Sequence, residues 1–160
     1  MASEAFERAK QEAMAGYLDP GPNHLNCAQT VIRCALLFLN QDPGLTTIAN
    51  YLGGGMARMG QLCGALSGCA VALGLKEYLE TKGKARSSPV TFDWLQQLTR
   101  DFQAQFGAVA CKDLLGCDIS TPEGFREAKK CGATKSCPSF VSWTCDRLAE
   151  RIDPAVNAPQ

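Results

Sequence analysis

Strong helix breakers divide this sequence into short segments, and within each segment apolar residues recur every three or four positions. The breakers include the stretches Asp19-Pro20-Gly21-Pro22, Asp42-Pro43-Gly44 and Gly53-Gly54-Gly55. Apolar residues at this spacing lie on one face of an α-helix, whereas a half-buried strand shows strict alternation. No segment alternates convincingly, so the sequence predicts an all-α fold.

The periodic segments predict six to eight helices joined by Gly/Pro-rich turns, in one compact domain over residues 1–160. Ser3 is the expected N-cap of the first helix, and Thr121-Pro122 is the expected start of a later one. Thr91 is expected to cap a long helix with Phe92 on its buried face. The expected helices begin near Ser3, Asn26, Leu45, Cys63, Thr91, Cys111, Thr121 and Cys137.

The charge balance narrows the classes of partner. The chain has 16 Lys and Arg against 16 Asp and Glu, which gives a formal net charge of zero. This balance argues against nucleic acid or an anionic membrane surface as the main partner. No apolar run approaches the roughly 20 residues that cross a bilayer, and the acidic start does not resemble a signal peptide. We therefore expect a soluble, cytoplasmic protein without membrane insertion; a homo-oligomer stays open.

Nine cysteines are the unusual feature of the composition. The odd number and the chain length argue against the disulfide framework of a small secreted protein. No Cys-x-x-Cys pair occurs, so the thioredoxin pair, the zinc ribbon and the bacterial ferredoxin motif are absent. The one histidine, His24, excludes a site built from several histidines.

Position relative to the expected helices divides the cysteines into groups. Unpaired N–H groups and the positive end of the helix dipole favour a thiolate at a helix start, so we expect lowered thiol pKa values there. A metal–thiolate centre would be stabilised by the same groups. Cysteine is also a small buried residue in many proteins, and this structural alternative stays open. The four cysteines at or near expected helix starts are Cys27, Cys63, Cys111 and Cys137.

The remaining residues have simpler interpretations. Cys34, Cys69 and Cys145 lie among apolar neighbours inside helices and are expected in the core. Cys117 and Cys131 lie next to glycines in turns and stay unassigned. The stretch Gly55–Gly60 is expected to wrap over the start of the Cys63 helix, with Met56 and Met59 as core side chains. Glycines are expected to let another helix, or a cluster, lie against this helix at short range, at Gly64, Gly68 and Gly74.

Several motifs occur in a recognisable order: Asn26-Cys27-Ala28-Gln29, Gly53–Gly60, Cys63-Gly64-Ala65-Leu66-Ser67-Gly68, Phe106-Gly107 with Cys111–Gly116, and Cys137–Val141. In this order they resemble the redox-active C_GCAxxG_C_C family over residues 26–148. The resemblance implies a helical fold and redox-active cysteines, and it maps the characteristic cysteines of the family onto Cys27, Cys63, Cys111 and Cys137. Cys117 matches a cysteine that is common in the family, and is a substitute ligand on this basis. A related domain in split-Soret cytochromes is associated with an iron–sulfur centre.

The leading hypothesis is a small electron-transfer protein that binds a two-iron or four-iron cluster through these four cysteines and exchanges electrons with an unidentified redox partner. Four thiolates are the usual complement of such clusters. The first alternative is a thiol–disulfide or peroxide-type oxidoreductase without a cofactor, in which Cys63 is the nucleophile and another of the four resolves it. The second is a zinc or soft-metal binding protein, although zinc ligands usually come in close pairs. Whether the protein is an enzyme stays open.

Overall fold

The computed structural model describes residues 1–84 and 86–157, and in this part of the chain it is built from helices joined by turns. The predicted all-α fold is confirmed. One isolated bridge, between Leu62 and Ala110, joins two of the connections. The helices are α1 (Glu4–Leu18), α2 (Cys27–Phe38), η1 (Pro43–Ala49), α3 (Gly64–Glu80), α4 (Pro89–Phe106), α5 (Cys111–Leu115), α6 (Pro122–Lys130), η2 (Ala133–Ser136), α7 (Cys137–Ile152) and η3 (Pro154–Asn157), where η denotes a 3-10 helix.

Side-chain caps fix three of the helix starts that the sequence predicts. Ser3 accepts a hydrogen bond from the Phe6 N–H at the start of α1, and Thr121 accepts one from the Gly124 N–H at the start of α6. Asn26 and Gln29 cap α2 reciprocally, each side chain accepting from the other residue's N–H. These caps satisfy donors that the first turn of a helix leaves unpaired.

One expectation about a helix start is wrong. The long helix α4 begins at Pro89 after the N-cap Ser88, because proline fits the first helical position. Thr91 therefore lies inside the first turn and donates to Glu77 Oε1 at 2.5 Å, while Phe92 is 56% exposed. The short helix expected near Leu45 is present as the 3-10 helix η1, which begins at Pro43 and ends at Ala49.

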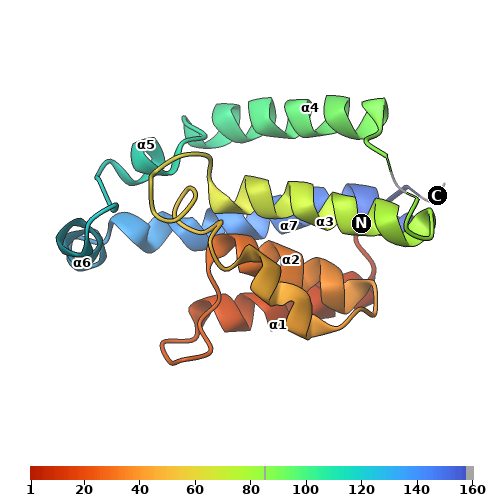
Figure 1. Cartoon of the computed structure of the whole chain (residues 1–160), viewed down its shortest axis with the longest axis horizontal. Helices are drawn as coiled ribbons and strands as arrows, with labels where there is room; N and C mark the ends of the chain where they lie inside the picture. The colour runs from red at the N-terminus through yellow and green to blue at the C-terminus, as the bar shows by residue number, and fades with distance from the viewer. Residues whose placement is uncertain (85, 158–160) are drawn as a thin grey trace.

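The N-terminal ends of three core helices lie at the same end of the molecule. Figure 1 shows α2, α3 and α7 beginning at the left, near α5, and running side by side to the right. One hydrophobic core joins them, with fully buried side chains from α1, α2, α3, α4 and α7. This arrangement gathers segments that are far apart in the sequence at one end of the bundle.

Glycines in α3 allow close contact with α2. A Cβ at Gly68 would lie 2.7 Å from the Ala28 carbonyl oxygen, and one at Gly64 would overlap the Cys27 sulfur. The close approach expected at these two positions is confirmed. Gly74 is different, because nothing lies within 4 Å of the place where its Cβ would be. The expectation is therefore wrong for Gly74, which lies on an exposed part of α3.

The connection before Cys63 contains an unusual run of left-handed backbone. Its φ angles are positive from Gly54 through Arg58, including 64° at Met56, and again at Gly60. Left-handed conformations are unfavourable for residues with a Cβ. Met56 and Met59 are 56% and 59% exposed, so their expected place in the core is wrong. The Arg58 guanidinium lies 3.9 Å above the Phe125 ring, which attaches this segment to α6.

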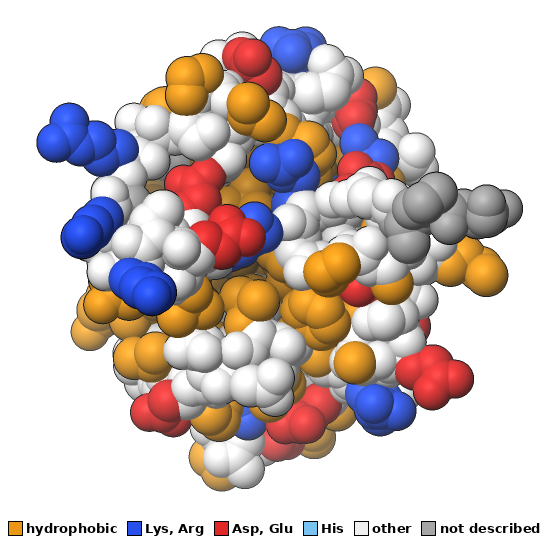
Figure 2. All heavy atoms as spheres, turned by 90° about the vertical axis from the view of Figure 1, so that its right-hand side faces the viewer, with side chains coloured by type: hydrophobic (Ala, Val, Ile, Leu, Met, Phe, Trp, Pro, Cys, Tyr) orange, Lys and Arg blue, Asp and Glu red, His pale blue; other side chains and the backbone are white. Residues whose placement is uncertain are grey.

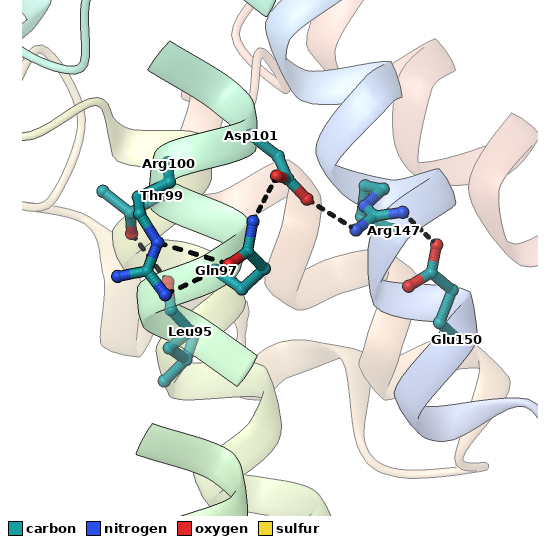
Figure 3. A network of polar contacts seen from close by, with 7 residues as sticks. All are labelled: Leu95, Gln97, Thr99, Arg100, Asp101, Arg147 and Glu150. Atoms are coloured by element: carbon teal, nitrogen blue, oxygen red, sulfur yellow. Dashed lines mark hydrogen bonds and ion pairs between the residues drawn. The ribbon is translucent and has the colours of Figure 1, made fainter. Parts of the chain in front are cut away.

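An ion pair attaches the long helix α4 to α7. Arg147 on α7 donates to Asp101 on α4 at 2.9 Å and to Glu150 at 2.6 Å, and Gln97 donates to the same aspartate (Figure 3). Acidic and basic side chains are interspersed on the face of the molecule that Figure 2 shows. In the described residues, no helix has the length and hydropathy needed to cross a membrane.

Candidate functional site

Four cysteines line one small cavity. Its volume is about 20 Å³, roughly the space for one water-sized group, and apolar side chains complete its wall. Each of the four lies at a helix start, as the sequence predicts: three are the first residues of α2, α5 and α7, and the fourth is the N-cap of α3. The cavity is lined by Cys27, Cys63, Cys111 and Cys137, with Leu114, Leu115 and Phe140.

Backbone pairing brings Cys63 and Cys111 together. The Cys63 N–H donates to the Val109 carbonyl at 2.8 Å, and the Cys111 N–H donates to the Gln61 carbonyl at 2.6 Å. The bridge between Leu62 and Ala110 lies between these two hydrogen bonds. This short antiparallel pairing fixes the backbones of the two cysteines relative to each other without any side-chain contact.

The start of α2 is held equally firmly, and this places Cys27. The Asn26 side-chain amide donates to the carbonyl oxygens of Ala49 and Asn50, at 3.3 and 3.1 Å. The Cys27 sulfur fits against α3 because Gly64 has no Cβ there. Backbone N–H groups of Gly54 and Gly64 donate to this sulfur. The left-handed run and the first turn of α3 therefore both contribute donors to the site.

Burial dominates the electrostatics of the four thiols. It raises the pKa of Cys27 and of Cys63 above the usual range, that of Cys111 to about 12 and that of Cys137 to about 11. The negative charge of neighbouring thiolates raises the last three further, whereas backbone N–H donors lower the pKa of Cys27 by less than burial raises it. The expectation that these helix starts lower the thiol pKa values is therefore wrong for the thiols without a bound cation.

The other five cysteines lie outside the cavity wall, and all nine are free. Cys34, Cys69 and Cys145 are fully buried in the main core, which confirms the prediction for them. Cys117 is half-buried in a small cluster that includes Cys111, so it lies near the site without lining the cavity. Cys131 is exposed.

The sequence interpretation did not include Tyr17, which lies on α1, in the candidate site. Burial raises the pKa of Tyr17 well above its usual range, and negative charge on Cys137, Cys27 and Cys63 raises it further, so the end of α1 lies near the site. The hydroxyl of a tyrosine on an apolar helix face needs a polar partner, and this requirement is the signal in the sequence that could have indicated a role for Tyr17. His24 is exposed, and its ring centroid lies 5.6 Å from that of Tyr17.

The chemistry of the wall suits a soft metal centre, since four thiols are its polar groups and the remaining lining side chains are apolar. Within residues 1–84 and 86–157, no three His, Cys, Asp or Glu side chains form a group that could hold a metal ion. The structure brings the four predicted cysteines together, and their role as ligands stays a prediction.

Comparison with known proteins gives one match. The model of a family described as "Putative redox-active protein (C_GCAxxG_C_C)" matches residues 25–151, which include all four cavity cysteines and exclude Tyr17. No curated protein and no solved structure matches the chain.

Proposed function

Because the chain belongs to the C_GCAxxG_C_C family of proteins described as redox-active, we propose that it transfers electrons through an iron–sulfur cluster bound by Cys27, Cys63, Cys111 and Cys137. The observation that carries the proposal is the shared cavity of these four cysteines. Four thiolates are the usual ligand set of two-iron and four-iron clusters. Zinc accepts the same ligands but has no redox chemistry, so it fits the family description less well.

The electrostatics also support a bound cationic centre. Four thiolates in one buried cavity repel one another and lack water, and the raised pKa values express both costs. Thiols become metal ligands by losing their protons, and the positive charge of the metal compensates the thiolate charge. The N–H donors that already contact the sulfurs of Cys27 and Cys63 would then stabilise the thiolates.

The same observations weigh against a thiol–disulfide enzyme. A nucleophilic cysteine needs a substantial thiolate fraction and access to its substrate. Cys63, the nucleophile in that alternative, is 5% exposed, and burial raises its pKa above the usual range. The fold thus protects this thiol and keeps it protonated, which suits a ligand better than a nucleophile.

The free space limits the size of the bound group. About 20 Å³ is close to the volume of one water-sized group, so side chains of the wall must move outward when a cluster binds. A two-iron cluster requires less displacement than a four-iron cluster. The helix α5 supplies Cys111, Leu114 and Leu115 to the wall. With five residues, it is the shortest of the four helices that carry the cysteines, and we expect it to move when a cluster binds.

The proposal is tested by isolating the protein without air from cells replete in iron and sulfide. We expect a visible absorption band with bound iron and acid-labile sulfide, and a loss of most of both in Cys63→Ser. Cys131→Ser and Cys69→Ala are the matched controls, because one thiol is exposed and the other lies in the core away from the cavity. Both controls should keep the band.

Two outcomes would overturn the proposal. A colourless, iron-free protein whose thiols oxidise to disulfides, with a mass loss of about 2 Da per bond that dithiothreitol reverses, would support the oxidoreductase. A colourless protein that chelators destabilise through loss of zinc would support a structural zinc site.

A further inference from the structure

A second, larger cavity lies on the surface of the bundle and is open to solvent. Its volume is about 490 Å³, within the range of about 300–1,000 Å³ that is usual for sites of small organic molecules. Five of its eight lining residues come from α7, and the others come from α1 and α4, which lie below and above α7 in Figure 1. We call this cavity the aromatic groove, and its wall includes Gln105, Phe106, Ser139, Ser142, Trp143 and Asp146.

Two aromatic rings connect the aromatic groove with the cysteine cavity. Phe106 lines the groove, Phe140 lines the cavity, and their ring centroids lie 4.8 Å apart in a T-shaped arrangement. The fully buried Phe102 ring packs against both of them, with centroid distances of 4.8 and 5.8 Å, and holds them in place. A molecule that contacts Phe106 from the groove is therefore separated from the wall of the cysteine cavity by a single ring.

The side chains of the groove suit a planar molecule with hydrogen-bond acceptors. The Phe106 and Trp143 rings, 5.7 Å apart between centroids, offer aromatic surface to such a molecule. The hydroxyls of Ser139 and Ser142 and the side-chain amide of Gln105 can donate hydrogen bonds. Carbonyl oxygens on a flat ring system are the matching acceptors.

The charges at the edge of the groove cancel each other. Asp146 forms an ion pair with Lys10, whose side chain is 15% exposed, so the groove offers no unpaired positive charge of its own to a phosphate group. This balance favours a neutral ligand over a nucleotide. We propose that the aromatic groove binds a neutral bicyclic quinone, with its ring against Phe106 and Trp143 and its carbonyl oxygens accepting from the serine and glutamine side chains.

Binding of the quinone does not depend on a cluster, whereas its use as an electron acceptor rests on the proposed function. Two reduced protein molecules, each giving one electron, and two protons from water convert one quinone to its hydroquinone. The rate of electron transfer falls steeply with distance, and the two rings between groove and cavity keep this distance short. The groove is then the place where electrons leave the protein.

Tryptophan fluorescence of the full chain isolated without air tests the binding. The two tryptophans are Trp94 and Trp143, so Trp94→Phe leaves the groove tryptophan as the only one. The probe is 2,3-dimethyl-1,4-naphthoquinone, whose methyl groups block the ring positions that thiols attack. We expect saturable quenching, and Ser142→Phe in this background should weaken binding at least about tenfold, because the added ring occupies the groove.

A matched pair of variants at exposed positions keeps the test valid if Ser142→Phe does not fold. Gln105→Ala removes a donor from the groove and should weaken binding severalfold, whereas Gln103→Ala on the same helix should not, because Gln103 lies outside the groove wall. Absence of saturable quenching, or equal affinities in Gln105→Ala and Gln103→Ala, would overturn the proposal whether or not the protein holds iron.

The use of the quinone is tested in the cluster-loaded protein, reduced with dithionite and freed of the excess. The quinone should restore the visible band of the oxidised protein, and it should do so severalfold more slowly in Gln105→Ala than in Gln103→Ala. Equal rates would overturn the groove as the exit for electrons. An iron-free protein that still binds the quinone would overturn the proposed function and support the groove as a quinone site.

Discussion

At the scale of single residues, the cavity thiols illustrate how burial and local position compete. A helix start offers N–H donors to a sulfur, and the Cys27 sulfur receives them. Removal of water raises the thiol pKa and prevails over these donors at all four cavity cysteines. At Cys63, Cys111 and Cys137, the charge of neighbouring thiolates raises the pKa further. The result is a group of protonated thiols that a bound cation would convert to thiolates.

These raised pKa values predict an order of reactivity in the metal-free protein. At pH 8, the exposed Cys131 should be alkylated at least about tenfold faster than Cys111 or Cys137, whose pKa values are about 12 and 11, because the thiolate is the reacting form. Quantitative mass spectrometry of the reduced, unloaded protein measures this order. Faster alkylation of Cys63 than of Cys131 would contradict it and point to a nucleophilic cysteine.

At the scale of helices, contact between α2 and α3 depends on glycines at particular positions. Gly64 and Gly68 face α2, and both would place a Cβ against its first turn. Gly74 lies farther along the same helix and faces no neighbour. Helix α3 therefore has glycines that the packing requires, Gly64 and Gly68, and one that it does not require, Gly74.

We predict opposite effects of alanine at two of these positions on the free energy of unfolding. Gly68→Ala should destabilise the protein by about 1–3 kcal/mol, because its Cβ meets the backbone of Ala28, which cannot move independently of α2. Gly74→Ala should stabilise it by about 0.5–1 kcal/mol through helix propensity. Urea unfolding of both variants measures the difference, and a stabilised Gly68→Ala would contradict the packing argument.

Helix starts were predictable from the sequence where the capping side chain bonds to a backbone N–H a few residues away. Ser3, Asn26 and Thr121 each bond to an N–H within three residues, so the sequence contains both partners. Thr91 was misassigned because Pro89 competes for the start of the same helix. The outward turn of Met56 and Met59 depends on left-handed backbone at residues other than glycine, which sequence propensity disfavours.

The candidate site was predictable only in part, for a similar reason. Placement at helix starts, together with the family resemblance, selected the four cysteines that line the cavity. The pKa values depend on how completely the surrounding helices exclude water, and the sequence does not contain this information. Tyr17 lies close enough to Cys137 for the thiolate charge to raise the tyrosine pKa, and because the two residues come from opposite ends of the chain, no local pattern indicates this.

At the scale of the whole molecule, a buried carboxylate joins the first and last α-helices. Asp153, which is 3% exposed, accepts hydrogen bonds from the Ser3 N–H at 2.6 Å and the Ala155 N–H at 3.0 Å. Burial raises its pKa, but these hydrogen bonds and the positive amino terminus lower it by more, so the pKa lies below the ordinary value. The charged form therefore stabilises the fold.

This lowered pKa predicts a dependence of stability on pH. The stabilisation is present above the ordinary Asp pKa of about 4 and is lost as the pH falls through the lower folded value, where the carboxylate takes up a proton. Between pH 7 and pH 3, the wild type should lose more unfolding free energy than Asp153→Asn, which has no charge to lose. Urea titrations at both pH values measure this, and equal losses would refute the assignment.

X-ray absorption at the iron edge of the protein isolated without air shows whether the four cavity cysteines bind an iron–sulfur cluster. We expect iron whose nearest neighbours are all sulfur, with a second iron close by, because the cavity offers thiols as its polar groups. Iron surrounded by nitrogen or oxygen, or a protein without iron that was isolated from an iron- and sulfide-replete source, would show that these cysteines do not hold such a cluster.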